Sequence, residues 1–108
     1  MIGASGDFNG DGNTDLVWRD MTTGSNVIWL MDGVGGFSSL KWLPPATTNW
    51  VIGASGDFNG DGNMDLVWRD TTTGNNLVWL VDGTVAPPSV SVKWLPAATT
   101  DWEIGGPK

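Results

Sequence analysis

Short apolar stretches alternate along the chain with turns rich in Gly, Asp, Asn and Thr. In the second half of the chain this pattern predicts strands at Trp50–Ser55, Asp65–Asp70, Asn76–Asp82 and Val90–Leu95. Apolar residues do not recur anywhere at helical spacing over three turns. Strands this short, separated by such turns, predict an all-β fold.

The third predicted strand of each half is apolar on both faces. It reads VIWLM at Val27–Met31 and LVWLV at Leu77–Val81, with no alternation of apolar and polar residues. Such a strand is covered above and below. The outer face of a two-sheet sandwich would show polar alternation, whereas a blade of a β-propeller is stacked between two others. The pattern therefore favours four-stranded antiparallel propeller blades.

The chain consists of one unit written twice. Residues 2–33 align with residues 52–83, and 26 of the 32 positions are identical. Residues 41–53 recur as residues 93–105, with an offset of 52 instead of 50, so two residues have been inserted before the second copy of this segment. A unit of about 50 residues is typical of propeller blades. The insertion lies among Pro and Ser and indicates a surface loop.

Two blades form an open arc, because a propeller ring needs about four to eight blades. We expect the first blade over residues 1–49, the second over 50–101, and the start of a third unit over 102–108. That start would lie where the first strand of another copy begins, which is consistent with head-to-tail closure. Three chains would give six blades and four would give eight. The near-identity of the units and the initial Met favour an excised or engineered piece of a longer propeller.

Composition excludes several classes of function. The 108 residues contain no His and no Cys, so a disulfide framework, a zinc site and Cys–His or Ser–His catalysis are ruled out. A net charge of −7 argues against a nucleic-acid partner. The apolar runs are too short for membrane insertion, and no signal peptide is recognisable. The 8 Trp and 16 Gly argue against disorder and for a turn-rich β protein.

Each unit carries an acidic loop with the pattern D-F-N-G-D-G-N-x-D. Oxygen side chains stand at its first, third, fifth and ninth positions, and a backbone carbonyl at the seventh, which suits a hard cation such as Ca²⁺. A strand follows instead of the helix of an EF-hand. The candidate Ca²⁺ ligands are Asp7, Asn9, Asp11, Asn13 and Asp15, and in the second unit Asp57, Asn59, Asp61, Asn63 and Asp65, with Asp15 and Asp65 as bidentate ligands.

Charge supports a cation in these loops. Three carboxylates within nine residues repel one another unless a cation lies between them. Two Ca²⁺ ions would change the formal charge from −7 to −3. Mg²⁺ is disfavoured because it keeps its waters and a rigid octahedron. The alternative is a plain Asx-rich turn, since Asn-Gly and Asp-Gly are also hairpin signals.

The residues GDFNGDGNTDLVWRD, followed by TTGSNVIWLMDG, resemble the bacterial VCBS or FG-GAP type of β-propeller repeat. The resemblance covers both units. It implies that the acidic loop joins the innermost strand of a blade to the second strand and binds Ca²⁺. Asn9 and Asn59 replace the commoner Asp, which implies somewhat weaker binding. The repeats are also similar to those of propeller lectins that bind sugars between blades.

The eight tryptophans form four pairs of equivalent positions in the repeat. We expect Trp29 and Trp79 in the core, and Trp18 and Trp68 between blades. The candidates for sugar-binding platforms are Trp42, Trp50, Trp94 and Trp102, which flank loops containing Thr, Asn and Asp. The alternative is that these four plug the seams between blades.

The leading hypothesis is a non-enzymatic, calcium-binding propeller that assembles with copies of itself and recognises carbohydrate at repeated sites. The alternative is a purely structural or engineered scaffold with no ligand except Ca²⁺. Catalytic residues are not assigned, because the acids outside the loops lie at strand ends or turns. We expect Arg19–Asp20 and Arg69–Asp70 to be solvated strand-end charges, the alternative being that the two arginines hydrogen-bond a ligand. Calcium dependence favours a secreted or cell-surface parent protein, because resting cytosolic calcium is low.

Overall fold

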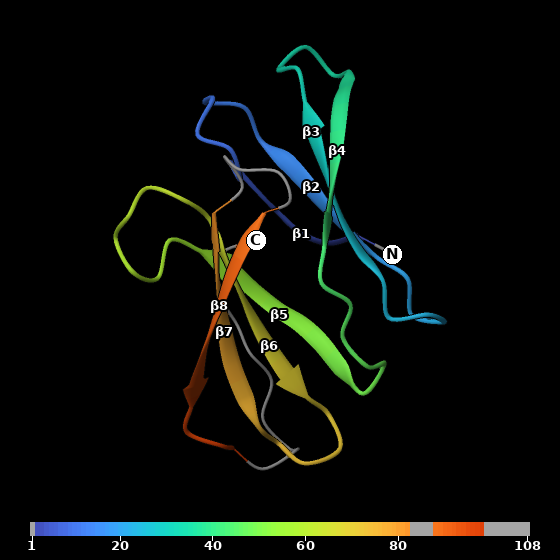
Figure 1. Cartoon of the computed structure of the whole chain (residues 1–108), viewed down its shortest axis with the longest axis vertical. Coiled ribbons are helices and arrows are strands. Elements are labelled where there is room, and N and C mark those ends of the chain that lie inside the picture. The colour runs from blue at the N-terminus through green and yellow to red at the C-terminus, as the bar shows by residue number, and fades with distance from the viewer. Residues whose placement is uncertain (1, 83–87, 99–108) are drawn as a thin grey trace.

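The computed structural model describes residues 2–82 and 88–98, which form two β-sheets joined by turns (Figure 1). The first sheet contains β1 (Ile2–Gly6), β2 (Asp15–Arg19), β3 (Asn26–Met31) and β4 (Phe37–Leu43), and the second contains β5 (Trp50–Gly56), β6 (Asp65–Asp70), β7 (Asn76–Asp82) and β8 (Ser89–Leu95). Strands follow chain order in both sheets, and every neighbouring pair is antiparallel. The all-β prediction of two four-stranded sheets is confirmed. Trp102 and the predicted third unit at 102–108 lie outside the described residues.

Each sheet has two apolar faces, because successive side chains of its central strands point to opposite sides. Cross-strand pairing places the tryptophans of β2 and β3 on one face and aliphatic residues on the other. We call the first the tryptophan face: Leu16, Trp18, Val27 and Trp29, and in the second sheet Leu66, Trp68, Leu77 and Trp79. We call the second the aliphatic face: Val17, Ile28 and Leu30, and in the second sheet Val67, Val78 and Leu80.

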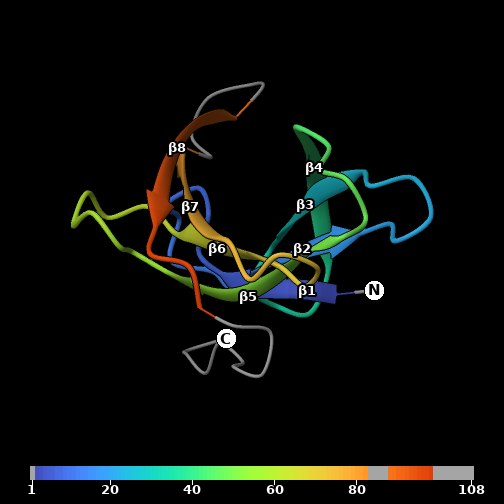
Figure 2. The same ribbon diagram turned by 90° about the horizontal axis from the view of Figure 1, so that it is seen from below.

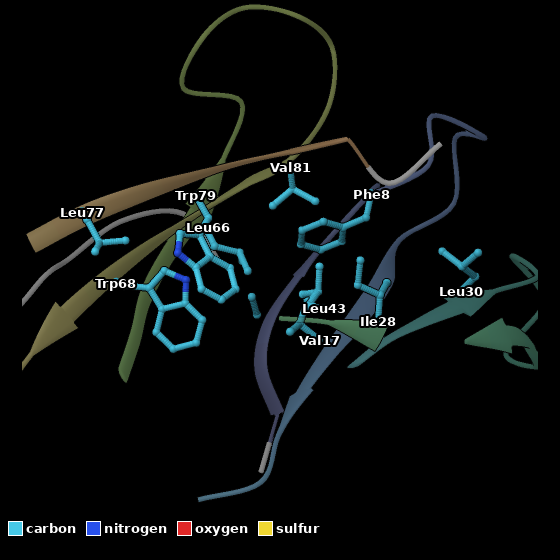
Figure 3. Close-up of a cluster of buried hydrophobic side chains, with 11 residues drawn as sticks. Phe8, Val17, Ile28, Leu30, Leu43, Leu66, Trp68, Leu77, Trp79 and Val81 are labelled. Carbon is cyan, nitrogen blue, oxygen red and sulfur yellow. The ribbon is translucent and has the colours of Figure 1, made fainter. Parts of the chain in front are cut away.

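The main core lies between the two sheets. The tryptophan face of the second sheet packs against the aliphatic face of the first in one cluster of buried residues, with Phe8 and Leu43 beside them (Figure 3). Trp68 is 1% exposed and Val17 is fully buried. The predicted core position of Trp79 is confirmed, whereas Trp29 is only half-buried. It lies on the tryptophan face of the first sheet, which no other described sheet covers.

The first strands of the two sheets, β1 and β5, lie side by side, whereas their last strands, β4 and β8, lie apart from each other (Figure 2). Their approach requires small residues. The Ser55 hydroxyl donates to the Ser5 carbonyl oxygen at 3.0 Å, and a Cβ atom at Gly3 would overlap the side chain of Ile52. Sheets that are close at their inner strands and splayed at their outer strands have the arrangement of neighbouring propeller blades.

Arg19 binds the linker between the two sheets, which consists of residues 44–49. Its side chain is 1% exposed, and its guanidinium lies 4.8 Å from the centre of a Trp68 ring. The guanidinium donates to backbone carbonyls at 2.8 to 3.1 Å and to the Asn26 side chain at 2.9 Å. The carbonyl acceptors are those of Gly24, Ala46, Thr47 and Trp50. Burial lowers the pKa of Arg19, and the carbonyl dipoles replace the water that the charge has lost.

The prediction of solvated charges at Arg19–Asp20 and Arg69–Asp70 is wrong for three of the four residues. Arg69 is buried and donates to Gly74 and to the Asn76 side chain, as Arg19 does to its own turn. Asp70 is 5% exposed and accepts a hydrogen bond from Asn49 at 2.9 Å. Only Asp20 is exposed. The linker following each sheet folds back onto the strand end, which a strand pattern does not reveal.

Candidate metal centre and aromatic hollows

The acidic loops join β1 to β2 and β5 to β6. In each loop the three aspartates bring carboxylate oxygens within 4.8 Å of one another. The first cluster is Asp7, Asp11 and Asp15, and the second is Asp57, Asp61 and Asp65. The structure therefore brings together six of the ten predicted ligands, three in each loop.

Backbone amides hold the first aspartate of each loop in place. Asp7 accepts hydrogen bonds from the N–H groups of Gly10 and Gly12, both at 2.8 Å, and from that of Asp11 at 3.2 Å. Gly10 and Gly12 have φ angles of 76° and 85°, which other residues rarely adopt. The second loop repeats these hydrogen bonds around Asp57. These hydrogen bonds are the main reason why the pKa of Asp57 is lowered.

The last aspartate of each loop is buried and joins the loop to the sheet. Asp15 accepts the N–H of Phe8 on one oxygen at 3.0 Å and the N–H of Met31 on the other at 2.9 Å. Asp65 does the same with Phe58 and Val81, both at 2.9 Å. Burial, followed by the charges of the other two aspartates, raises the pKa of both carboxyls against the lowering effect of these bonds.

The donor set of each loop fits a hard divalent cation. Oxygen is the only ligand atom that the three aspartates and two asparagines offer to such an ion. Each oxygen of Asp15 keeps a second lone pair after accepting its backbone hydrogen bond. Burial, and after it the charges of Asp11 and Asp7, raise the pKa of Asp15, so a cation bound among the three carboxylates would stabilise its charged form. The asparagines bond within the loop, where Asn9 accepts the Asp11 N–H at 3.3 Å.

The aromatic candidates lie in two different surroundings. Trp42 and Trp94 are 60% and 65% exposed, on the outer strands β4 and β8. Trp50 is half-buried at the boundary between the sheets, and its ring meets that of Trp94 edge-on at 6.0 Å. The structure thus brings Trp50 and Trp94 together and leaves Trp42 apart from them.

Two hollows adjoin these rings. The hollow on the second sheet has a volume of about 350 Å³ and is lined by apolar residues, among them Trp50, Trp68 and Trp94. The equivalent hollow on the first sheet has a volume of about 730 Å³ and includes Trp18 and Trp42. Ala46 of the linker and Trp50 of β5 line the smaller hollow, whereas the larger hollow is lined only by residues of the first sheet and of the turn after β2.

Sequence reasoning missed the structural role of Arg19 and Asn26. The signal was present in the repeat: Arg69 and Asn76 have the same spacing of seven residues. Both asparagines accept from the arginine of their own sheet and donate to the carbonyl of the proline after the fourth strand at 3.0 Å. These buried polar residues position the linker.

Within residues 2–82 and 88–98, no helix has the length and hydropathy needed to cross a membrane.

Comparison with protein families places the acidic loop in a known repeat. The family described as an FG-GAP-like repeat matches residues 7–68, from the first acidic loop through the first sheet to β6. Comparisons with curated proteins and with solved structures gave no match. The family match spans more than half of the chain and agrees with two sheets arranged as neighbouring blades. The chain belongs to the FG-GAP-like repeat family.

Proposed function

We propose that this chain is a non-enzymatic, calcium-binding propeller module that completes a ring with copies of itself. One observation carries the proposal. The tryptophan face of the second sheet is buried against the first sheet, while the same face of the first sheet is half-exposed. A large apolar face of this kind is typical of an interaction surface.

In this proposal one Ca²⁺ ion binds to each acidic loop. The ligands would be Asp7, Asn9, Asp11, Asn13 and Asp15, and the corresponding residues of the second loop. The ion supplies positive charge where three carboxylates converge, and it lowers the repulsion between chains that each carry a net charge of −7. If the parent protein is secreted or on the cell surface, its surroundings contain enough calcium to fill such loops.

Two acids outside the loops, Asp20 and Asp32, have structural roles in their own turns, which supports the non-enzymatic part of the proposal. Asp20 accepts the N–H groups of Thr22 and Thr23, and Asp32 accepts those of Val34 and Gly36. Each carboxylate therefore shapes its own turn. We assign no catalytic role to them.

Native mass spectrometry tests calcium binding and assembly together. We expect a closed species of three or four chains in calcium acetate, with two Ca²⁺ per chain that EDTA removes. The double variant Asp11→Asn/Asp61→Asn keeps the shape of the loops and should lose the metal, because it removes one charge from each cluster. The control is Asp32→Asn, which changes a carboxylate outside both clusters. A wild-type chain that remains a metal-free monomer would contradict the proposal.

Carbohydrate recognition is a second candidate function, favoured by the contact between Trp50 and Trp94. Aromatic ring faces stack on the apolar faces of sugars, and a ring of chains would repeat a weak site several times. A glycan array probed with the assembled protein tests this function. Trp94→Ala should abolish any signal, while Val34→Ala, a change at an exposed turn, should leave it intact. Absence of binding across the array would favour the purely structural scaffold.

A further inference from the structure

We infer that copies of the chain join in one direction, with the aliphatic face of the second sheet of one copy packed on the tryptophan face of the first sheet of the next. Phe58 is the side chain that enters this junction. The inference rests on the self-assembly proposed above and adds which surfaces meet and how they are oriented.

The receiving surface is the tryptophan face of the first sheet. Its members Leu16, Trp18 and Trp29 are half-buried, whereas their counterparts in the second sheet are at most 7% exposed. The hollow of about 730 Å³ lies on this face. In the second sheet the first sheet and the linker cover the same positions, and the hollow shrinks to about 350 Å³. The tryptophan face of the first sheet therefore has room for a packed sheet, as the tryptophan face of the second sheet already has.

The entering surface lies on the opposite side of the second sheet. Phe58 is 48% exposed, and its counterpart Phe8 is fully buried. Leu95 is 41% exposed, and its counterpart Leu43 is 5% exposed. Val67 and Val78 are already buried in a small cluster of their own sheet. Phe58 and Leu95, together with the half-buried Leu80, are therefore the apolar residues of this surface whose counterparts fill the boundary between the sheets.

The boundary inside the chain is the template for the boundary between chains. Leu16, Trp18 and Trp29 are identical in type to Leu66, Trp68 and Trp79. The entering residues Phe58 and Leu95 are identical in type to Phe8 and Leu43. A second copy can thus repeat the packing shown in Figure 3 with apolar residues throughout, seven of the ten labelled residues having a counterpart of the same type. The other three, Ile28, Leu77 and Val81, are replaced by Val78, Val27 and Met31. Because two different surfaces meet, the contact is heterologous, and it closes a ring when the rotation permits.

A hydrogen bond within the acidic loop fixes the backbone of Phe58. The Phe58 N–H donates to Asp65 at 2.9 Å, as the Phe8 N–H donates to Asp15 at 3.0 Å. Both phenylalanines follow the first aspartate of their loop. The backbone is fixed in the same way in both units, and the surroundings of the ring are what differs.

Two blocking variants test the direction of assembly. Phe58→Asp places a charge on the entering surface, and Trp18→Asp places one on the receiving surface. Each should raise the Kd of assembly by roughly 100-fold or more, because the charge would be buried without a partner. Mixed in equal amounts, they should form a dimer with one copy of each, since each variant keeps the surface that the other needs. Sedimentation velocity at concentrations where the wild-type chain assembles measures both effects.

Controls separate this inference from the proposed function. Val34→Asp changes a side chain that is 88% exposed in the turn after β3 and should assemble as the wild type does. Leu16→Lys is a second block of the receiving surface if Trp18→Asp fails to fold by circular dichroism. Wild-type assembly that Phe58→Asp leaves unchanged, or a mixture without the dimer, would overturn the direction but not self-assembly. A wild-type chain that never assembles would refute the proposed function itself.

Discussion

The two units are nearly identical in sequence and unequal in surroundings. Six of the 32 aligned positions between residues 2–33 and 52–83 differ, yet Phe8 is fully buried and Phe58 is 48% exposed. Trp68 is 1% exposed, and the equivalent Trp18 is half-buried. In stacked repeats, each unit obtains part of its stability from the boundary with its neighbour. Here the first unit is covered on its aliphatic face and the second on its tryptophan face.

The acidic loops show the opposite behaviour. The hydrogen bonds around Asp7 and Asp57 are the same in pattern and within 0.1 Å in length. These bonds form within nine residues, so a neighbouring sheet is not needed to make them. Local geometry is thus a property of the unit, whereas burial is a property of the pair.

The largest expected difference between the units is at the two phenylalanines. Phe8→Ala should lower the free energy of unfolding by about 3–5 kcal/mol, because it empties a fully buried site. Phe58→Ala should cost the monomer under about 1 kcal/mol, because its ring is already half in water. Urea unfolding at concentrations that keep the chain monomeric measures both. Equal losses would show that the two environments are alike in solution.

Arg19 provides a test of the linker contact. Arg19→Lys keeps the charge but loses the planar fork that reaches several carbonyls, so we expect a loss of about 2 kcal/mol in unfolding free energy. Thermal and urea unfolding of the monomer measure this loss. The matched change in the second unit is Arg69→Lys. A loss below about 0.5 kcal/mol for Arg19→Lys would contradict the linker role.

Calcium should act equally on both units. At a free concentration of 100 times Kd, each bound ion should add about 2.7 kcal/mol to the free energy of unfolding. Asp11→Asn and Asp61→Asn should therefore lose similar shares of the stabilisation, because the two loops have the same geometry. Isothermal titration measures calcium binding by each variant, and thermal unfolding with and without EDTA measures how much of the stabilisation by calcium each variant loses. Loss at only one loop would show that the neighbouring sheet influences the metal site.

The effect of pH should change sign with calcium. Asp15 and Asp65 have pKa values raised above 3.8 in the folded chain. Without calcium the folded state takes up protons at higher pH than the unfolded chain, so stability should rise as the pH falls through those raised pKa values toward 3.8. With calcium bound, protons compete with the ion, and stability should fall over the same window.

Other carboxyls act at lower pH and serve as an internal control. Hydrogen bonds from Val34 and Gly36 hold the pKa of Asp32 below 3.8, so its contribution is lost only as the pH falls below that value. Urea unfolding across the acidic range, with calcium and with EDTA, separates the two windows. Curves of the same slope above pH 3.8 in both solutions would contradict the assignment of Asp15 and Asp65.

The smallest effects belong to the exposed tryptophans. Trp94→Ala should cost about 1 kcal/mol more than Trp42→Ala, because only Trp94 has an edge contact with Trp50. Trp42 lies on the outer strand of the first sheet, whose tryptophan face is open. Chemical unfolding of the two variants measures the difference. Identical stabilities would mean that the contact contributes nothing in solution.

Sequence patterns located the strands because their signals are local. The predicted strands Asp65–Asp70 and Asn76–Asp82 match β6 and β7 at both ends, since turns bound them on either side. The aspartates of each acidic loop also converge as predicted, because nine residues with two glycines at positive φ can bring them together alone. The buried roles of Arg19 and Arg69 were missed, because some of their acceptors are backbone carbonyls 27 to 31 residues further along the chain.

By itself, the sequence determined the strands, the turns, the acidic loops and the division into two equivalent units. Each of these depends on contacts within a few residues or between adjacent strands. Only the tertiary structure decided which copy of a residue is buried. Phe8 and Phe58 have the same local sequence, so their different exposure arises entirely from the sheet that covers one and not the other. A repeated sequence does not encode the position of a unit within its array, because burial at a boundary requires a neighbour.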